Sequence, residues 1–97
     1  MSLHHCHAIG CNVPTKPTKL MCLKHWLLVP KSVQHDVLRF YRLGQCDDKR
    51  PSLAWGIAAT RARLAVAEKE GRRPAVALLS KILEIRTAKL RSEGLEI

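Results

Sequence analysis

The stretch Cys6–His25, CHAIGCNVPTKPTKLMCLKH, determines how this chain is expected to fold. It carries the pattern Cys-x4-Cys-x10-Cys-x2-His, whose members are Cys6, Cys11, Cys22 and His25. Two pairs of soft or borderline ligands that are separated by a short loop can close a tetrahedron around Zn²⁺. The pattern therefore predicts a zinc site. Because four protein ligands leave no open coordination position, we expect the zinc to be structural.

The residues around the two ligand pairs predict a treble-clef-like zinc finger over residues 1–30. Residues 12–21 contain two prolines and two threonines, which favours a short, irregular β-hairpin or a loop. The next residues have helical character as far as Pro30, so Cys22 and His25 would share one face of a first helical turn. This segment has too little apolar surface to fold alone, and structural zinc supplies about 10–16 kcal/mol to such segments.

The first ligand and the fourth cysteine both have alternatives. The candidates for the first ligand are His4, His5, Cys6 and His7, of which we expect Cys6, with His7 next. The remaining histidines would lie beside the site or in solvent. Cys46 stands in a loop before Asp47 and Asp48, whose negative charges disfavour a thiolate. We therefore expect Cys46 to be a spare thiol.

Length and charge restrict the classes of function. The chain has 97 residues, with 17 Lys and Arg against 8 Asp and Glu, and a net charge of +9. We expect residues 1–97 to form a single domain, which argues against a two-domain enzyme, and the charge favours an anionic partner. No apolar run approaches the about 18 residues of a membrane span, and residues 1–10 lack the core of a signal peptide. We expect a cytoplasmic protein with reduced cysteines.

The remainder of the chain predicts helices, and hence a mainly α fold. A basic amphipathic helix is expected over residues 31–44, ending at Gly44. Its apolar face consists of Val33, Val37, Phe40 and Tyr41. Its opposite face consists of Lys31, His35, Arg39 and Arg42. The hypothesis is that these residues bind an anionic partner such as nucleic acid; the alternative is an ordinary solvated face.

A C-terminal helical hairpin is expected over residues 51–97. Its first helix, roughly Leu53–Glu70, would begin with Ser52 as the N-cap or Pro51 at the N1 position, and Gly71 would end it. Pro74 would then open a second helix over about Ala75–Ser92. The small inward face of the first helix consists of Ala54, Ile57, Ala58, Ala62, Leu64 and Ala65, with Trp55 near the start. The broader face of the second consists of Val76, Leu78, Leu79, Ile82, Leu83, Ile85 and Leu90. We expect this last helix to lie centrally against the others; the alternative is that part of it contacts another chain.

The order of motifs resembles a set of small zinc-finger proteins encoded by bacteriophages and prophages. The motifs are Cys-x4-Cys-x10-Cys-x2-His-Trp, Val29-Pro30, Tyr41-Arg42-x-Gly44-Gln45, Pro51-Ser52 and Val66–Gly71, within residues 6–71. The resemblance implies that the Cys and His residues of the first motif bind zinc and that Trp26 packs the finger onto the helices. Trp55 and the long helix after Gly71 depart from the pattern. These proteins have no firmly assigned activity, so the resemblance implies none here.

We expect a binding protein and not an enzyme. The preferred hypothesis is a DNA-binding or regulatory protein that acts in a bacterial host cell through its basic helix. The alternative is a protein-interaction module that binds a host or viral protein through Trp55 and the last helix. A homodimer through Leu79, Leu83 and Leu90 would cover that helix. The only close acid–base pair, His35-Asp36, consists of neighbours in a helix that point in different directions.

Overall fold

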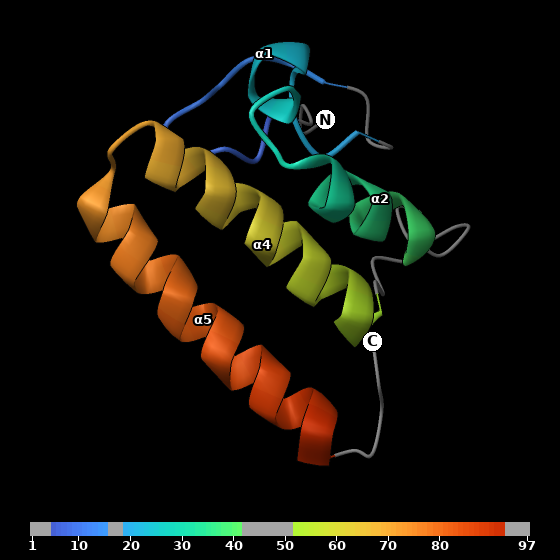
Figure 1. Ribbon diagram of the computed structural model, residues 1–97. Coiled ribbons are helices and arrows are strands. Elements are labelled where there is room, and N and C mark those ends of the chain that lie inside the picture. Colours follow the sequence, from blue (N-terminus) through green and yellow to red (C-terminus); the bar gives the residue numbers. More distant parts are fainter. Residues whose placement is uncertain (1–4, 16–18, 42–51, 93–97) are drawn as a thin grey trace.

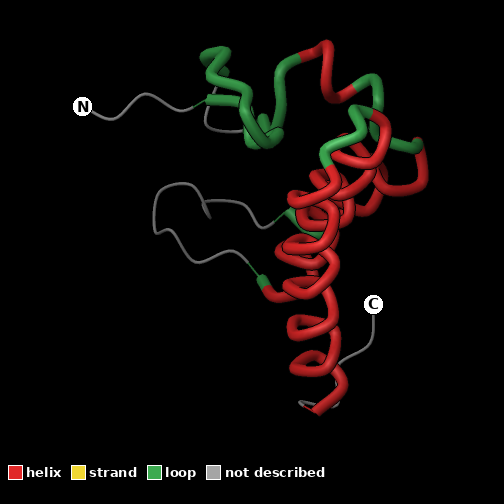
Figure 2. Tube along the Cα trace, turned by 90° about the vertical axis from the view of Figure 1, so that its left-hand side faces the viewer, coloured by secondary structure: helices red, strands yellow, loops and turns green. Residues whose placement is uncertain are grey.

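The computed structural model describes residues 5–15, 19–41 and 52–92 (Figure 1). These residues form the helices α1 (Leu23–Trp26), α2 (Lys31–Arg39), α4 (Leu53–Lys69) and α5 (Arg73–Ser92). Among them, β-type pairing is restricted to one antiparallel bridge between His5 and Pro14. The mainly α fold is therefore confirmed, since the described part of the chain is drawn as helices and loops in Figure 2. No helix in the described ranges combines the length and the apolar character that a membrane crossing requires.

Helix α4 is the central element of the fold. It packs against α5 on one side and against α2 on another (Figure 1). The side chains that it buries lie around much of its circumference, and they are Ile57, Ala58, Ala59, Thr60, Ala62, Val66 and Ala67. The expected inward face is correct for Ile57, Ala58 and Ala62, whereas Ala54, Leu64 and Ala65 are only half-buried. Because most of these side chains are small, neighbouring elements can approach α4 closely from two directions.

The expectation that the last helix lies centrally is wrong. Helix α5 lies at the edge and runs alongside α4 (Figure 1). It buries Ala75, Leu79 and Leu90, while Leu78 and Ile85 are 59% and 61% exposed. One partner helix can cover only one side of α5, so Val76, Ile82 and Leu83 of its wide apolar face are half-buried and Leu78 and Ile85 are exposed.

Local signals set the ends of the two long helices. The hydroxyl of Ser52 accepts a hydrogen bond of 3.1 Å from the backbone N–H of Trp55 at the start of α4, as predicted. Gly71 follows the end of α4 with φ of +69°, which lies in the left-handed region that favours glycine. Pro74 occupies the first turn of α5, where its missing N–H needs no partner.

Helix α2 is shorter than expected. It ends at Arg39 with Phe40 as its C-cap, and the predicted stop at Gly44 and the loop over 45–51 lie outside the described residues. Val37 is buried, and Val33 and Phe40 pack against the same core. The apolar face of this helix therefore covers α4, as its periodicity predicts.

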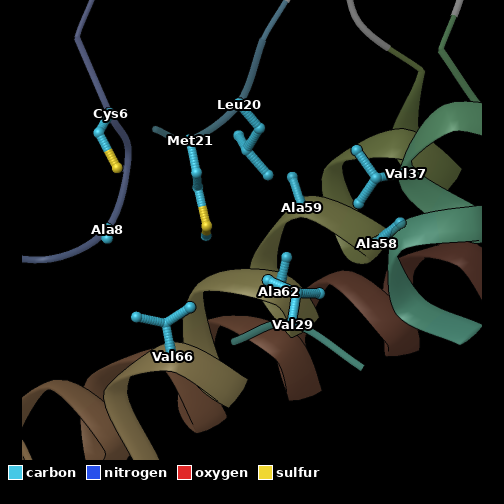
Figure 3. Packing of buried hydrophobic residues seen from close by; sticks show 10 residues of the cluster. All are labelled: Cys6, Ala8, Leu20, Met21, Val29, Val37, Ala58, Ala59, Ala62 and Val66. Carbon is cyan, nitrogen blue, oxygen red and sulfur yellow. The ribbon is translucent and has the colours of Figure 1, made fainter. Parts of the chain in front are cut away.

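Residues of the N-terminal segment and of the helices share one hydrophobic core (Figure 3). The segment contributes Cys6, Ala8, Leu20, Met21 and Val29, which pack with Val37 of α2 and with Ala58, Ala59, Ala62 and Val66 of α4. Trp26 is half-buried and packs against this cluster, which agrees with the position that the resemblance implies. Since the N-terminal segment supplies half of this core, the helices depend on it for much of their buried surface.

Polar contacts also link α4 to α5. Nη1 of Arg86 donates to the hydroxyl of Thr60 at 2.6 Å and to the carbonyl oxygen of Gly56 at 3.1 Å. The Thr60 hydroxyl, in a residue that is 1% exposed, donates in turn to the Gly56 carbonyl at 2.7 Å. The buried hydroxyl is thus fully satisfied, which fixes the register of the two helices.

Candidate metal centre

The four predicted ligands come together at one point. The donor atoms of Cys6, Cys11, Cys22 and His25 all lie within 4.8 Å of one another. Nδ1 of His25 is 3.6 Å from Sγ of Cys6 and 3.2 Å from Sγ of Cys22. All three cysteines are free thiols. This Cys₃His group could hold a metal ion, because three sulfurs and one imidazole nitrogen converge on a common centre.

A tight turn places the first pair of ligands side by side. The backbone N–H of Cys11 donates to the carbonyl oxygen of Ala8 at 3.1 Å, and Gly10 has φ of +80°. The N–H of Cys6 donates to the carbonyl oxygen of Val13 at 2.8 Å, which anchors the start of the turn. A glycine is favoured at this position because the backbone enters the left-handed region there.

The second pair of ligands lies at the start of α1. Cys22 is the N-cap residue, and its carbonyl oxygen accepts from the N–H of Trp26 at 2.9 Å. His25 lies one turn later on the same face, as the spacing predicts. A hydrogen bond of 2.9 Å from the N–H of His7 to the carbonyl oxygen of Leu20 holds the two pairs of ligands together.

The segment between the two pairs is irregular. Residues 12–15 and 19–21 contain no helix, as predicted, but they form no β-hairpin either. The isolated bridge joins Pro14 to His5, outside the segment, and residues 16–18 are not described. Proline lacks the N–H group that a strand ladder requires, which explains why Pro14 supports only an isolated bridge.

Burial and hydrogen bonding affect two of the cysteines in opposite ways. Cys6 is fully buried, and desolvation raises the pKa of its thiol to about 11. Burial also acts to raise the pKa of Cys22, but a hydrogen bond from the backbone of His25, together with contacts to the side chains of His25, Cys6 and Cys11, outweighs it and lowers this pKa to about 7. A thiolate is the form that binds a metal, so Cys22 is closer than Cys6 to its ligating form.

A carboxylate completes the surroundings of the imidazole. Oε2 of Glu70 lies 3.2 Å from Nε2 of His25, on the side of the ring away from the sulfurs. Oε1 of Glu70 accepts from Nε of Arg72 at 3.3 Å. Desolvation acts to raise the pKa of Glu70, but hydrogen bonds with His25 and Arg72 outweigh it and lower the pKa. Glu70 is therefore ionised at neutral pH.

The sequence offers no chemical signal for Glu70. It lies 45 residues from His25 along the chain, and it appears only as one member of the Val66–Gly71 motif. No local spacing rule connects a ligand in α1 with the C-cap residue of α4. The contact follows from the way in which the end of α4 packs beside the metal ligands.

Basic side chains of α4 and its end also hold the N-terminal segment. Nζ of Lys69 donates to the carbonyl oxygen of Leu28, and Nε of Arg63 donates to that of His7 at 3.1 Å. The guanidinium of Arg72 lies against Gly10, where a Cβ atom would come within 3.2 Å of its Nη1. These contacts reach both flanks of the metal ligands.

The alternative candidates for the first ligand lie outside the cluster. His5 and His7 are exposed, and neither belongs to the four-residue group found within the described ranges. The Nδ1 atom of His5 instead lies 2.9 Å from the carbonyl oxygen of Cys6. His4 and Cys46 lie outside the described residues.

The expected basic face is present on α2 as far as the structure describes it. Lys31, His35 and Arg39 are exposed, on the side opposite to the buried Val37, and Arg42 lies outside the described residues. The guanidinium of Arg39 stacks over the ring of Phe40 at 5.1 Å from its centroid. Within the described part of the chain, none of these three basic side chains forms an ion pair.

The residues expected to contact another chain are largely covered. Trp55 is half-buried against the core, Leu79 and Leu90 are buried within the chain, and Leu83 is half-buried. Of the three residues named for a possible homodimer, Leu79 packs with Ala67 of α4, and Leu90 is 4% exposed. Other large apolar side chains are exposed, namely Val13, Leu23, Leu27, Leu38, Leu78 and Ile85.

Comparisons of the chain with protein families, with curated proteins and with solved structures found no match. Any conclusion about function therefore rests on the positions of the chain's own residues.

Proposed function

We propose that the chain binds one Zn²⁺ through Cys6, Cys11, Cys22 and His25, and that this zinc is structural. Zn–S bonds of about 2.3 Å and Zn–N bonds of about 2.0 Å place the donors of a tetrahedral site about 3.5–3.8 Å apart. The distances of 3.6 and 3.2 Å from Nδ1 of His25 to two sulfurs are close to this separation, and all four donors lie within 4.8 Å, so small side-chain shifts would close the site around zinc. Four protein donors fill the tetrahedron and leave no position for a substrate.

Loss of one thiol ligand is expected to weaken zinc binding severely. We predict that Cys11→Ser lowers the zinc affinity by more than the roughly 10- to 100-fold that loss of an outer partner costs. Competition with a chromophoric chelator gives the affinity, and native mass spectrometry gives the stoichiometry. Cys46→Ser is the matched control, because Cys46 is expected to be a spare thiol. Equal affinities for the two variants, or an unmodified chain without one zinc, would contradict the proposal.

We further propose that the zinc-loaded protein binds nucleic acid, with DNA as the first candidate, through the basic face of α2. The observation that carries this proposal is the exposed row of Lys31, His35 and Arg39, which form no ion pair within the described residues, in a chain of net charge +9. The opposite side of α2 packs on α4 through Val37, which keeps the basic face directed outward. Phosphate contacts require such an arrangement of exposed cations on a rigid support.

We propose that this binding takes place in a bacterial cytoplasm, where thiol ligands remain reduced. A protein partner is the second candidate, and one specific observation favours it. Leu23, the first residue of α1, and Leu27, its C-cap residue, are 71% and 68% exposed beside the proposed metal ligands. An apolar pair on a short rigid helix is a suitable contact for another protein.

The basic face is tested by removal of two of its charges. We expect Lys31→Ala with Arg39→Ala to weaken binding to duplex DNA at every sequence and to reduce the slope of log K against log salt by about 2, near 0.9 for each lost phosphate contact. Fluorescence anisotropy at several salt concentrations measures both quantities.

The matched control for this test changes the net charge equally at another place. Lys81→Ala with Lys89→Ala removes two exposed cations from α5. Equal weakening by the two double variants would show that the charge acts without a defined face. If the unmodified protein does not bind DNA at physiological salt, the proposal of nucleic-acid binding is overturned. A protein partner that contacts the exposed leucines is then the better candidate.

A further inference from the structure

We propose that Glu70 is a positioning residue for the metal centre: it selects the nitrogen with which His25 binds the metal and connects the site to the junction between α4 and α5. This inference rests on the proposed zinc binding. It assigns a role to a contact between residues that are 45 positions apart in the chain.

The contact with Glu70 determines which nitrogen of the His25 imidazole carries the proton. An ionised carboxylate can only accept hydrogen bonds, so the contact of 3.2 Å with Glu70 requires the proton on Nε2 of His25. A neutral imidazole has one N–H, and its other nitrogen then carries the free lone pair. That nitrogen is Nδ1, which faces the sulfurs of Cys6 and Cys22. Glu70 thus favours the tautomer that presents a ligand to the metal.

Glu70 is itself held in place, as a positioning residue must be. It is the C-cap of α4, and its N–H donates to the carbonyl oxygen of Val66 at 2.9 Å. Its second carboxylate oxygen accepts from Arg72, and its side chain is 23% exposed. Partial burial protects the His25–Glu70 contact from competing water, which strengthens the hydrogen bond.

The junction that carries Glu70 also holds the segment that carries the ligands. Lys69 donates to the carbonyl oxygen of Leu28, which lies after His25, and Arg72 lies against Gly10, which precedes Cys11. One short stretch of chain, Lys69–Arg72, therefore contacts His25 itself and a residue beside each of the two ligand pairs. Metal binding orders the ligands that this stretch contacts, and docking of the stretch orients His25, so each event favours the other.

Three variants of the full chain test this role through zinc affinity. Glu70→Ala removes the acceptor and is expected to weaken zinc binding by about 10- to 100-fold in competition with a chelator. Glu70→Gln keeps a carbonyl oxygen at the same position and is expected to restore most of the affinity. Glu68→Ala is the control, because it removes an equal charge from an exposed residue two positions away.

The imidazole nitrogens provide a readout that a purely structural role would not change. In the zinc-loaded unmodified protein, ¹H–¹⁵N spectra that resolve the His25 ring are expected to show zinc on Nδ1 and a slowly exchanging proton on Nε2. In Glu70→Ala, that proton is expected to exchange faster with solvent. These spectra and the Glu70→Gln affinity decide the matter even if Glu70→Ala does not fold.

The outcomes separate this inference from the zinc proposal. If the unmodified chain binds no zinc, both the zinc proposal and the role of Glu70 are overturned. If it binds one zinc and Glu70→Ala matches Glu68→Ala in affinity, or if zinc is found on Nε2 of His25, only the role of Glu70 is overturned. Weaker binding by Glu70→Ala, with rescue by Glu70→Gln and zinc on Nδ1, supports it.

Discussion

Removal of the metal from the zinc-loaded protein is expected to eliminate its cooperative unfolding transition. Structural zinc supplies about 10–16 kcal/mol of apparent binding energy, whereas the net stability of a domain is about 5–15 kcal/mol. The N-terminal segment contributes Cys6, Ala8, Leu20, Met21 and Val29 to the main core cluster. Without the metal, these side chains lose their fixed positions and the alanine face of α4 loses its cover.

Calorimetry and intrinsic fluorescence measure this effect. After addition of a zinc chelator we expect no sharp heat-absorption peak and a red-shifted emission, because Trp26 and Trp55 both pack against the affected core. Renewed addition of zinc is the control, and it should restore both signals. A chelated protein that unfolds sharply at an unchanged temperature would show that the helices hold the fold without the metal.

The second large effect is expected from Leu79→Ala. The Leu79 side chain is fully buried and packs with Ala67 and Ala75 where α5 meets α4. Truncation removes its transfer free energy and leaves a cavity that small neighbours cannot fill. We expect the free energy of unfolding to fall by about 2–5 kcal/mol. Urea denaturation of the zinc-loaded protein gives this value.

The neighbouring residue provides the control for Leu79. Leu78 is 59% exposed, so Leu78→Ala is expected to change the free energy of unfolding by no more than about 0.5 kcal/mol. Equal losses for the two variants would contradict the observed orientation of α5. If the loss for Leu78→Ala also depended on protein concentration, a second copy of the chain would be covering this face.

The clustering of the four candidate ligands could be predicted because each pair lies within a short interval of sequence. Cys22 and His25 belong to one helical turn, and Cys6 and Cys11 flank one tight turn. The tautomer of His25 could not be predicted, since it depends on Glu70 at the far end of α4. A donor set is thus a local property, whereas its outer partner depends on packing.

The layering of the helices could not be predicted from periodicity. The wide apolar face of α5 indicates a central position, yet α4 occupies it. Alanine adds little to an amphipathic pattern, so burial of Ala59 and Ala67 in two separate core clusters leaves almost no trace in the sequence. Small side chains nevertheless allow α2 and α5 to approach α4 closely, and the close packing stabilises this arrangement.

The sequence alone was sufficient for features that depend on neighbours along the chain. The cap at Ser52, the helix end at Gly71 and the spacing of the ligands are such features, because a few adjacent residues satisfy their hydrogen bonds and backbone angles. The tertiary structure alone decided that α4 is central, that Leu78 is exposed beside the buried Leu79, and that a carboxylate meets His25. These features depend on which surfaces pack together over long separations, and such contacts form only when the whole chain minimises its exposed apolar area.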